Sequence, residues 1–147
     1  MSRLSVDTKA QALRCLVEGN SIRSTERMTG VHRDTITKVV VQTGKGCDRL
    51  TDDHIRQVEC RELQLDEIWG FAGKKRGHVQ KTDDPSKVGD FWTWVALDRN
   101  TKLVPAYHVG KRHREDADAL LKLVARRVEG RVQISTDKLA AYKFAIA

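Results

Sequence analysis

The spacing of apolar residues changes near residue 60, and this change constrains the fold more than any other feature of the sequence. Over residues 5–42 the apolar side chains recur at the spacing of one face of an α-helix. From Glu62 onward they occur in short runs of strand length, separated by polar turns. A chain of 147 residues can bury one modest core or two small ones. We therefore expect a helical unit followed by a unit built on a sheet.

Three helices are predicted in the first unit. The first covers residues 5–18, and a short second helix ends at Gly30. The third segment, 32–42, is rich in β-branched residues and would suit a strand as well as a helix. Its residues Ile36 and Val39 fall at helical spacing, which favours a helix.

Polar, glycine-containing residues separate the two units. Residues 43–61 are only weakly periodic, as expected for a linker that carries a short helix. The predicted organisation is a helical domain at 1–44, a linker at 45–60 and a sheet domain at 61–147.

The second domain is predicted to contain four strands and a crossover helix. A turn at 98–101 joins the second and third strands as an antiparallel hairpin. The helix then leads to a fourth strand, which we expect to lie parallel to the first, giving an α/β arrangement. The predicted strands are 63–70, 91–97, 103–109 and 132–135, the helix is 114–128, and 72–89 is a long polar loop.

Two aspartates are the candidate catalytic and metal-binding residues. Asp66 lies in an otherwise apolar strand, where an ionised carboxylate is costly unless it meets a cation. Asp137 closes the fourth strand, so the two carboxylates converge if the first and fourth strands are neighbours. Such a pair could hold Mg²⁺ ions that bridge a scissile phosphate. Two alternatives remain open: Asp137 could cap the last helix, and Asp66 could pair with a nearby arginine.

The charge of the chain favours a polyanionic partner. Its 27 Lys and Arg against 20 Asp and Glu give a formal charge of +7, which attracts nucleic acid through counterion release. Most of the excess lies in residues 61–147, with seventeen basic and twelve acidic side chains. A generic solvated surface is the alternative interpretation of the same charge.

Cysteine usage and the N-terminus indicate a reducing compartment. The three cysteines, Cys15, Cys47 and Cys60, form no Cys-x-x-Cys pair, so neither a zinc ribbon nor a disulfide framework is supported. No signal peptide and no apolar run of membrane-spanning length is visible. We expect a cytoplasmic protein with no membrane partner.

Four separated motifs resemble the catalytic domain of bacterial insertion-sequence transposases, most closely the insertion-sequence-one type. Residues 18–23 and 28–31 also look like the helix-turn-helix of that group, so the likeness spans nearly the whole chain. The four motifs, in the order of the family, are Leu65-Asp66-Glu67-Ile68-Trp69, the run from Asp90 to Asp98, Thr101-Lys102-Leu103-Val104-Pro105, and Ile134-Ser135-Thr136-Asp137.

The resemblance implies an all-α helix-turn-helix head followed by an incomplete ribonuclease-H-like mixed-sheet domain. It implies a DDE transposase that uses Mg²⁺ or Mn²⁺, with Asp66 and Asp137 as the first two members of the Asp-Asp-Glu triad. Residues 138–147 contain no Asp or Glu, so the triad is incomplete. We therefore expect a truncated copy with little or no strand-transfer activity of its own.

The expected partner is double-stranded DNA, both element ends and target. In a helix-turn-helix, residues at the start of the second helix of the pair reach base edges. The candidates there are His32, Arg33, Thr35 and Lys38, and Arg112 and Arg114 could line the DNA path in the second domain.

Other interpretations of the whole chain remain open. Residues 5–42 could be a plain helical hairpin with a basic face. The chain could also be a DNA-binding regulator without catalysis, or a non-functional fragment. The resemblance implies a location at the bacterial nucleoid and leaves a homo-oligomer open.

Overall fold

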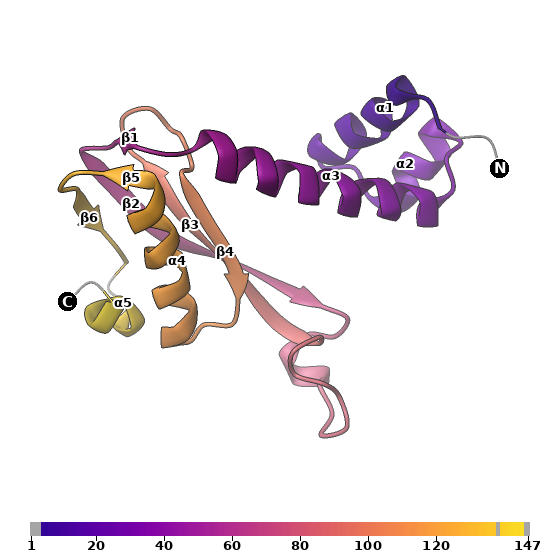
Figure 1. Cartoon of the computed structure of the whole chain (residues 1–147). Helices are drawn as coiled ribbons and strands as arrows, with labels where there is room; N and C mark the ends of the chain where they lie inside the picture. The colour runs from indigo at the N-terminus through magenta and orange to yellow at the C-terminus, as the bar shows by residue number, and fades with distance from the viewer. Residues whose placement is uncertain (1–3, 138, 146–147) are drawn as a thin grey trace. The chain divides into compact units, whose positions relative to one another are not determined.

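The computed structural model describes residues 4–137 and 139–145, which belong to two compact units, Met1–Asp53 and His54–Ala147. The first unit is helical and the second contains a mixed sheet with helices (Figure 1). This confirms the expected order, helices first and a mixed sheet afterwards. The elements are α1 (Val6–Val17), α2 (Ile22–Thr29), α3 (Arg33–His54), β1 (Val58–Glu59), β2 (Glu62–Ala72), the 3₁₀ turn η1 (Arg76–His78), β3 (Gly89–Asp98), β4 (Ala106–Gly110), α4 (Arg114–Arg127), β5 (Val128–Glu129), β6 (Gln133–Ser135) and α5 (Ala140–Ala145).

Serine caps and one glycine define the first two helices. The Ser5 hydroxyl accepts a hydrogen bond from the backbone N–H of Thr8, and Ser21 caps α2 in the same way. Gly30 ends α2 in the left-handed conformation, with φ of 69°, which glycine adopts without a steric penalty. Ala12, Val31 and Ile36 form the buried core of this unit.

Helix α3 is longer than expected, because it continues through residues predicted to form the linker. It spans 22 residues and ends at His54. Gly44 and Gly46 lie within it; each costs about 1 kcal/mol relative to alanine but keeps its backbone hydrogen bond, so neither must end the helix. None of the helices in the described part of the chain is long and apolar enough to cross a membrane.

The four-stranded sheet has the order β4-β3-β2-β6. Strand β2 pairs antiparallel with β3, and β3 pairs antiparallel with β4. On its other side β2 pairs parallel with β6, which confirms the expected parallel relation between the first and last strands of the sheet. Helix α4 follows β4 at one edge of the sheet, and the chain then reaches β6 at the other edge. Helix α4 therefore belongs to a crossover connection.

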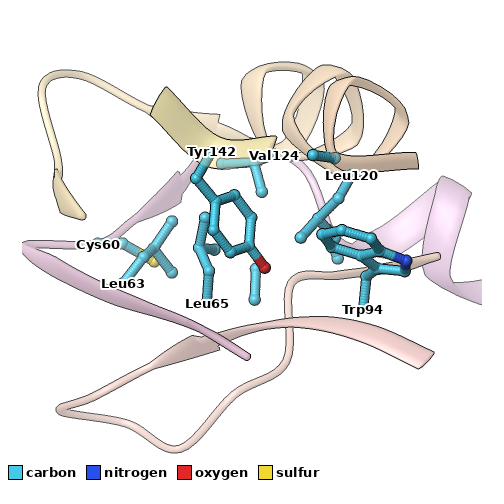
Figure 2. Close-up of a cluster of buried hydrophobic side chains, with 10 residues drawn as sticks. Cys60, Leu63, Leu65, Trp94, Leu120, Val124 and Tyr142 are labelled. Carbon is cyan, nitrogen blue, oxygen red and sulfur yellow. The ribbon is translucent and has the colours of Figure 1, made fainter. Parts of the chain in front are cut away.

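One face of this sheet forms the main core. Leu63 and Leu65 of β2 point to this face, where they meet residues of β3, β4, α4 and α5 (Figure 2). The alternation of side chains along a strand therefore assigns odd-numbered residues of β2 to the core face and even-numbered ones to the opposite face. The opposite face exposes Ile68, Tyr107 and Val109.

Three local features differ from the sequence-based expectation. Strand β4 begins at Ala106 rather than at residue 103, because the preceding turn closes with a 2.8 Å hydrogen bond from Asp98 N to the carbonyl of Leu103. A short parallel pair, β1 with β5, was not predicted, since two residues are too few to show a period. The polar loop between β2 and β3 contains η1.

Candidate metal and DNA-binding sites

The pairing of β2 with β6 makes neighbours of the strand that contains Asp66 and the strand that precedes Asp137. The parallel register places Gln64 opposite Ser135, the last residue of β6. Two residues further along each chain stand Asp66 and Asp137. Asp66 therefore lies within β2, and Asp137 lies two residues beyond the end of the neighbouring strand β6, although they are 71 positions apart in the sequence.

The buried carboxylate of this region is Glu67, not Asp66. The sequence predicted that Asp66 would be costly to accommodate in an apolar strand. This prediction was wrong, because Asp66 points away from the core and its side chain is exposed. Glu67 has the same parity as Leu63 and Leu65, and only 1% of its side chain is accessible. Strict alternation along β2 was the sequence signal that could have identified it. The Oδ1 atom of Asp66 accepts a 2.8 Å hydrogen bond from the Glu67 backbone N–H.

Arg112 joins two of the carboxylates. It lies between β4 and α4, and its guanidinium donates to Glu67 Oε2 from Nη2 at 3.0 Å and from Nε at 3.3 Å. Its Nη2 also lies 3.6 Å from Oδ2 of Asp137. The same guanidinium is stacked over the ring of Trp92, 4.5 Å from its centroid. Arg112 is thus held by one buried carboxylate, one exposed carboxylate and one aromatic ring.

Asp137 also contacts the start of the last helix. Its Oδ1 atom accepts a 3.1 Å hydrogen bond from the Leu139 backbone N–H, just before α5. This is the capping type of contact that the sequence left as an alternative role for Asp137. The other alternative, an arginine paired with Asp66, is not seen among the described residues, where Arg112 pairs with Glu67 and Asp137.

Tyr142 of α5 lies beside these carboxylates. Its ring packs edge-on against Trp94 at 5.6 Å, and Figure 2 shows it within the core. Burial, together with the carboxylates of Glu67, Asp137 and Asp66, raises the pKa of the Tyr142 hydroxyl. The Tyr142 hydroxyl and the Glu67 carboxylate lie close enough for a hydrogen bond, which contributes to this rise, although its geometry is not ideal. Sequence reasoning missed this tyrosine, since a single aromatic residue in a short segment has no distinctive pattern.

We refer to Asp66, Glu67 and Asp137, together with Arg112 and Tyr142, as the carboxylate cluster. Its donor atoms are hard oxygens, the type that Mg²⁺ and Mn²⁺ prefer. Within the described structure, Glu67 faces both Arg112 and the Tyr142 hydroxyl. In that same part of the chain, no three His, Cys, Asp or Glu side chains are arranged to hold a metal ion.

A cavity of about 460 Å³ adjoins the cluster through Arg112. Arg76, Lys111 and Arg112 line it together with Trp92, and Asp90 is the acidic residue in its wall. The Lys111 ammonium donates a 2.8 Å hydrogen bond to the backbone carbonyl of Asp90. The acceptor in this contact is not a carboxylate. A cavity with several cations and an aromatic wall suits a phosphate-bearing ligand.

The start of α3 is capped by a histidine instead of the serine or threonine that is usual at this position. His32 takes that role, because its Nδ1 accepts a 3.3 Å hydrogen bond from the backbone N–H of Asp34. The backbone N–H of Arg33 donates to Glu26 Oε1 at 3.0 Å. With Nδ1 engaged, His32 has only its other ring nitrogen for a DNA contact.

The remaining predicted DNA contacts differ in how freely they can reach a ligand. The side chain of Arg33 is 57% accessible and lies 4.0 Å from Asp34. Lys38 is exposed, whereas Thr35 is half-buried. Arg114, at the first residue of α4, is 59% accessible and lies 3.8 Å from Asp118. Arg112, in contrast, is engaged in the carboxylate cluster.

Comparison with known proteins finds only distant likeness. No family model matches the chain, and no curated protein matches it. Similar solved structures include the Mos1 strand transfer complex, with a TM-score of 0.37 and 13% identity over 97% of this chain and 55% of that one. The Mos1 transposase paired-end complex with the left transposon end and the mariner Mos1 paired-end complex with Mg each give a TM-score of 0.34 and 12% identity over 97% of this chain. This chain spans about half the length of these chains, 55–56%.

Proposed function

We propose that this chain is a DNA transposase of the insertion-sequence type, a DDE polynucleotidyl transferase in which Asp66 and Asp137 hold Mg²⁺ or Mn²⁺. The observation that supports the proposal is the parallel pairing of β2 with β6, which makes neighbours of the strand that contains Asp66 and the strand that ends two residues before Asp137. The strand order, with an antiparallel hairpin and a crossover helix that leads to a parallel strand, is compatible with a ribonuclease-H-like domain.

Each part of the cluster has a distinct task in this proposal. Asp66 and Asp137 bind the metal, which when bound activates the attacking hydroxyl and stabilises the leaving oxygen of the scissile phosphodiester. Arg112 and Lys111 bind the phosphate groups of the DNA next to these carboxylates, since both line the adjoining cavity. Glu67 positions Arg112 through its two hydrogen bonds.

DNA recognition is assigned to α2 and α3. The two helices are joined by a short turn at Gly30, and Arg33 opens α3 with an exposed side chain, as in the recognition helix of a helix-turn-helix. Arg33 is the candidate for a bidentate contact with guanine. These features do not depend on the carboxylates. They equally support the alternative function, a DNA-binding regulator that occupies element ends without cleaving them.

One variant separates the two functions. Because the triad that the resemblance implies is incomplete in this sequence, we expect at most weak cleavage of DNA that carries the element ends in Mg²⁺ or Mn²⁺. Asp66→Asn should abolish this cleavage, while the DNA affinity stays within about two-fold or rises because a repulsive charge is removed. Asp118→Asn on α4 is the matched control and should leave both unchanged. Metal-dependent cleavage that survives Asp66→Asn would refute the catalytic assignment. DNA binding without cleavage by the unmodified chain would favour the regulator.

A further inference from the structure

We propose that Trp69 and Phe71 of β2 form a surface on which the unpaired bases of single-stranded DNA stack. We call these two side chains the aromatic platform. The inference extends the DNA-binding part of the proposed function, because a helix-turn-helix reads paired bases whereas this surface would hold a separated strand. It requires no metal ion at the aspartates.

The platform lies on the part of β2 that extends beyond the main core. Strand β4 pairs with β3 only from Trp92 to Ala96, and the ends of β2 and β3 next to η1 project past α4 (Figure 1). Trp69 lies opposite Trp92, which packs against the edge of the core. Trp69 and Phe71 alternate in step with Leu65, so they continue the core face of the sheet past the point where α4 covers it.

Both rings of the platform are open to solvent. Trp69 is 47% and Phe71 49% accessible, and neither contributes to the main core of the described residues. Their centroids are 6.0 Å apart and their planes are tilted by 33°, so the rings touch obliquely and do not cover each other. Adjacent exposed aromatic side chains form an apolar patch of the kind that marks a binding surface. An aromatic ring can stack on any base, whatever the sequence of the strand.

Cations surround the platform. The Lys75 ammonium lies 5.6 Å from the centroid of the Phe71 ring, and Arg76 and Lys111 line the adjoining cavity of about 460 Å³. One acid, Asp90, lies opposite Phe71 in the register, and its Oδ1 accepts a 3.3 Å hydrogen bond from the backbone N–H of Arg76. The cations outnumber this acid, so the backbone phosphates of a strand stacked on the rings would meet a positive surface.

The charge around the platform favours single-stranded DNA over a second copy of this chain as the occupant. In a two-fold symmetric dimer the same patch lies on both sides of the interface, so the cations of one copy would face those of the other and repel them. A DNA strand brings phosphates to these cations instead. Duplex DNA fits the rings less well, because its bases are already stacked on one another.

The test measures binding of the full chain to a fluorescein-labelled oligothymidylate of about 12 nucleotides by anisotropy, beside a blunt duplex of similar length. The wild type should bind the oligothymidylate saturably. Trp69→Ala should weaken this binding about ten-fold, the loss expected when one base no longer stacks, and should weaken duplex binding much less. Trp69→Phe keeps an aromatic ring and should restore most of the affinity. The matched control Ile68→Ala removes an exposed apolar side chain from the opposite face and should change the affinity less than about two-fold. Far-UV circular dichroism checks that each variant is folded.

Several results would overturn the inference. They are equal losses on both DNAs in Trp69→Ala, no saturable binding of oligothymidylate by the wild type, and tighter binding of an oligouridylate of the same length, which would assign the platform to RNA. If Trp69→Ala leaves the oligothymidylate affinity unchanged but reduces self-association in light scattering, the platform is instead a contact between copies. Failure of the proposed function is distinguishable: expected oligothymidylate results without metal-dependent cleavage would refute catalysis and leave this inference standing.

Discussion

The ion pair between Glu67 and Arg112 is buried at one end only, and this asymmetry leads to a quantitative prediction. Glu67 has 1% of its side chain accessible, whereas Arg112 has 40%. The free energy of unfolding should therefore respond very differently when one or the other partner is removed. We consider Arg112→Gln, Glu67→Gln and the double variant.

Loss of Arg112 leaves a buried carboxylate without its cation, close to two other acids. Breaking a buried pair in this way costs about 3–5 kcal/mol. Loss of Glu67 leaves a guanidinium that is partly hydrated and still faces Asp137, so we expect a cost of about 1 kcal/mol or less, as for exposed pairs. The double variant removes both charges. It should recover about 2 kcal/mol or more relative to Arg112→Gln alone.

Urea unfolding at neutral pH, followed by tryptophan fluorescence, measures these values in the correct part of the chain. All three tryptophans, Trp69, Trp92 and Trp94, belong to the second unit, so the signal reports the unfolding of the sheet. Far-UV circular dichroism provides an independent signal. If Glu67→Gln destabilises the domain as much as Arg112→Gln, the unequal burial of the pair does not govern its energetics and the reasoning is refuted.

Three other outcomes can be measured separately. Arg33→Ala should weaken binding to element-end DNA by about ten-fold or more and binding to random DNA much less; equal losses in a titration of both DNAs would argue against base reading. Leu120→Ala, at a fully buried position of α4, should lower the free energy of unfolding by about 2–5 kcal/mol in the same urea assay, and a loss well under this range would mean that the core is loosely packed. Hydrogen bonds from the Thr101 hydroxyl and from a backbone N–H lower the pKa of Asp98, so its contribution to stability is complete above the unfolded pKa of about 4 and is lost as the pH falls through the folded pKa. The difference in urea midpoint between the wild type and Asp98→Asn should accordingly be larger near pH 7 than near pH 3, and a constant difference would exclude this linkage.

Much of the fold could be predicted because long periodic segments determine it. The α4 helix was expected at 114–128 and is observed at Arg114–Arg127, since its apolar residues recur at helical spacing and its first turn is acidic. The antiparallel β3–β4 hairpin and the parallel placement of β6 beside β2 were also expected, from the turn at 98–101 and from the crossover helix. Helix α3 was expected to be shorter, because the prediction treated glycine as a residue that ends a helix. The helix continues through its glycines, since each of them keeps its backbone hydrogen bond.

The candidate site was harder to predict. Its aspartates were selected by residue type and by their places at two strands, and the register shows only that these two strands are neighbours. The contacts that surround them come from Arg112 and Tyr142, which enter from a loop and from a short helix. Loop and helix contacts of this kind depend on packing in three dimensions, and no local period encodes them. The roles of Asp66 and Asp137 in catalysis remain predictions for the experiments above.

The apolar side of the sheet that faces away from α4 affects how the protein behaves in concentrated solution. Ile68 and Val109 are 62% and 56% accessible there, and such a surface tends to associate with another of its kind. The formal charge of +7 opposes that association through repulsion between copies. Because salt screens this repulsion, the chain should become less soluble as ionic strength rises. Colloidal stability thus depends on the same basic excess to which the proposed function assigns the attraction of DNA.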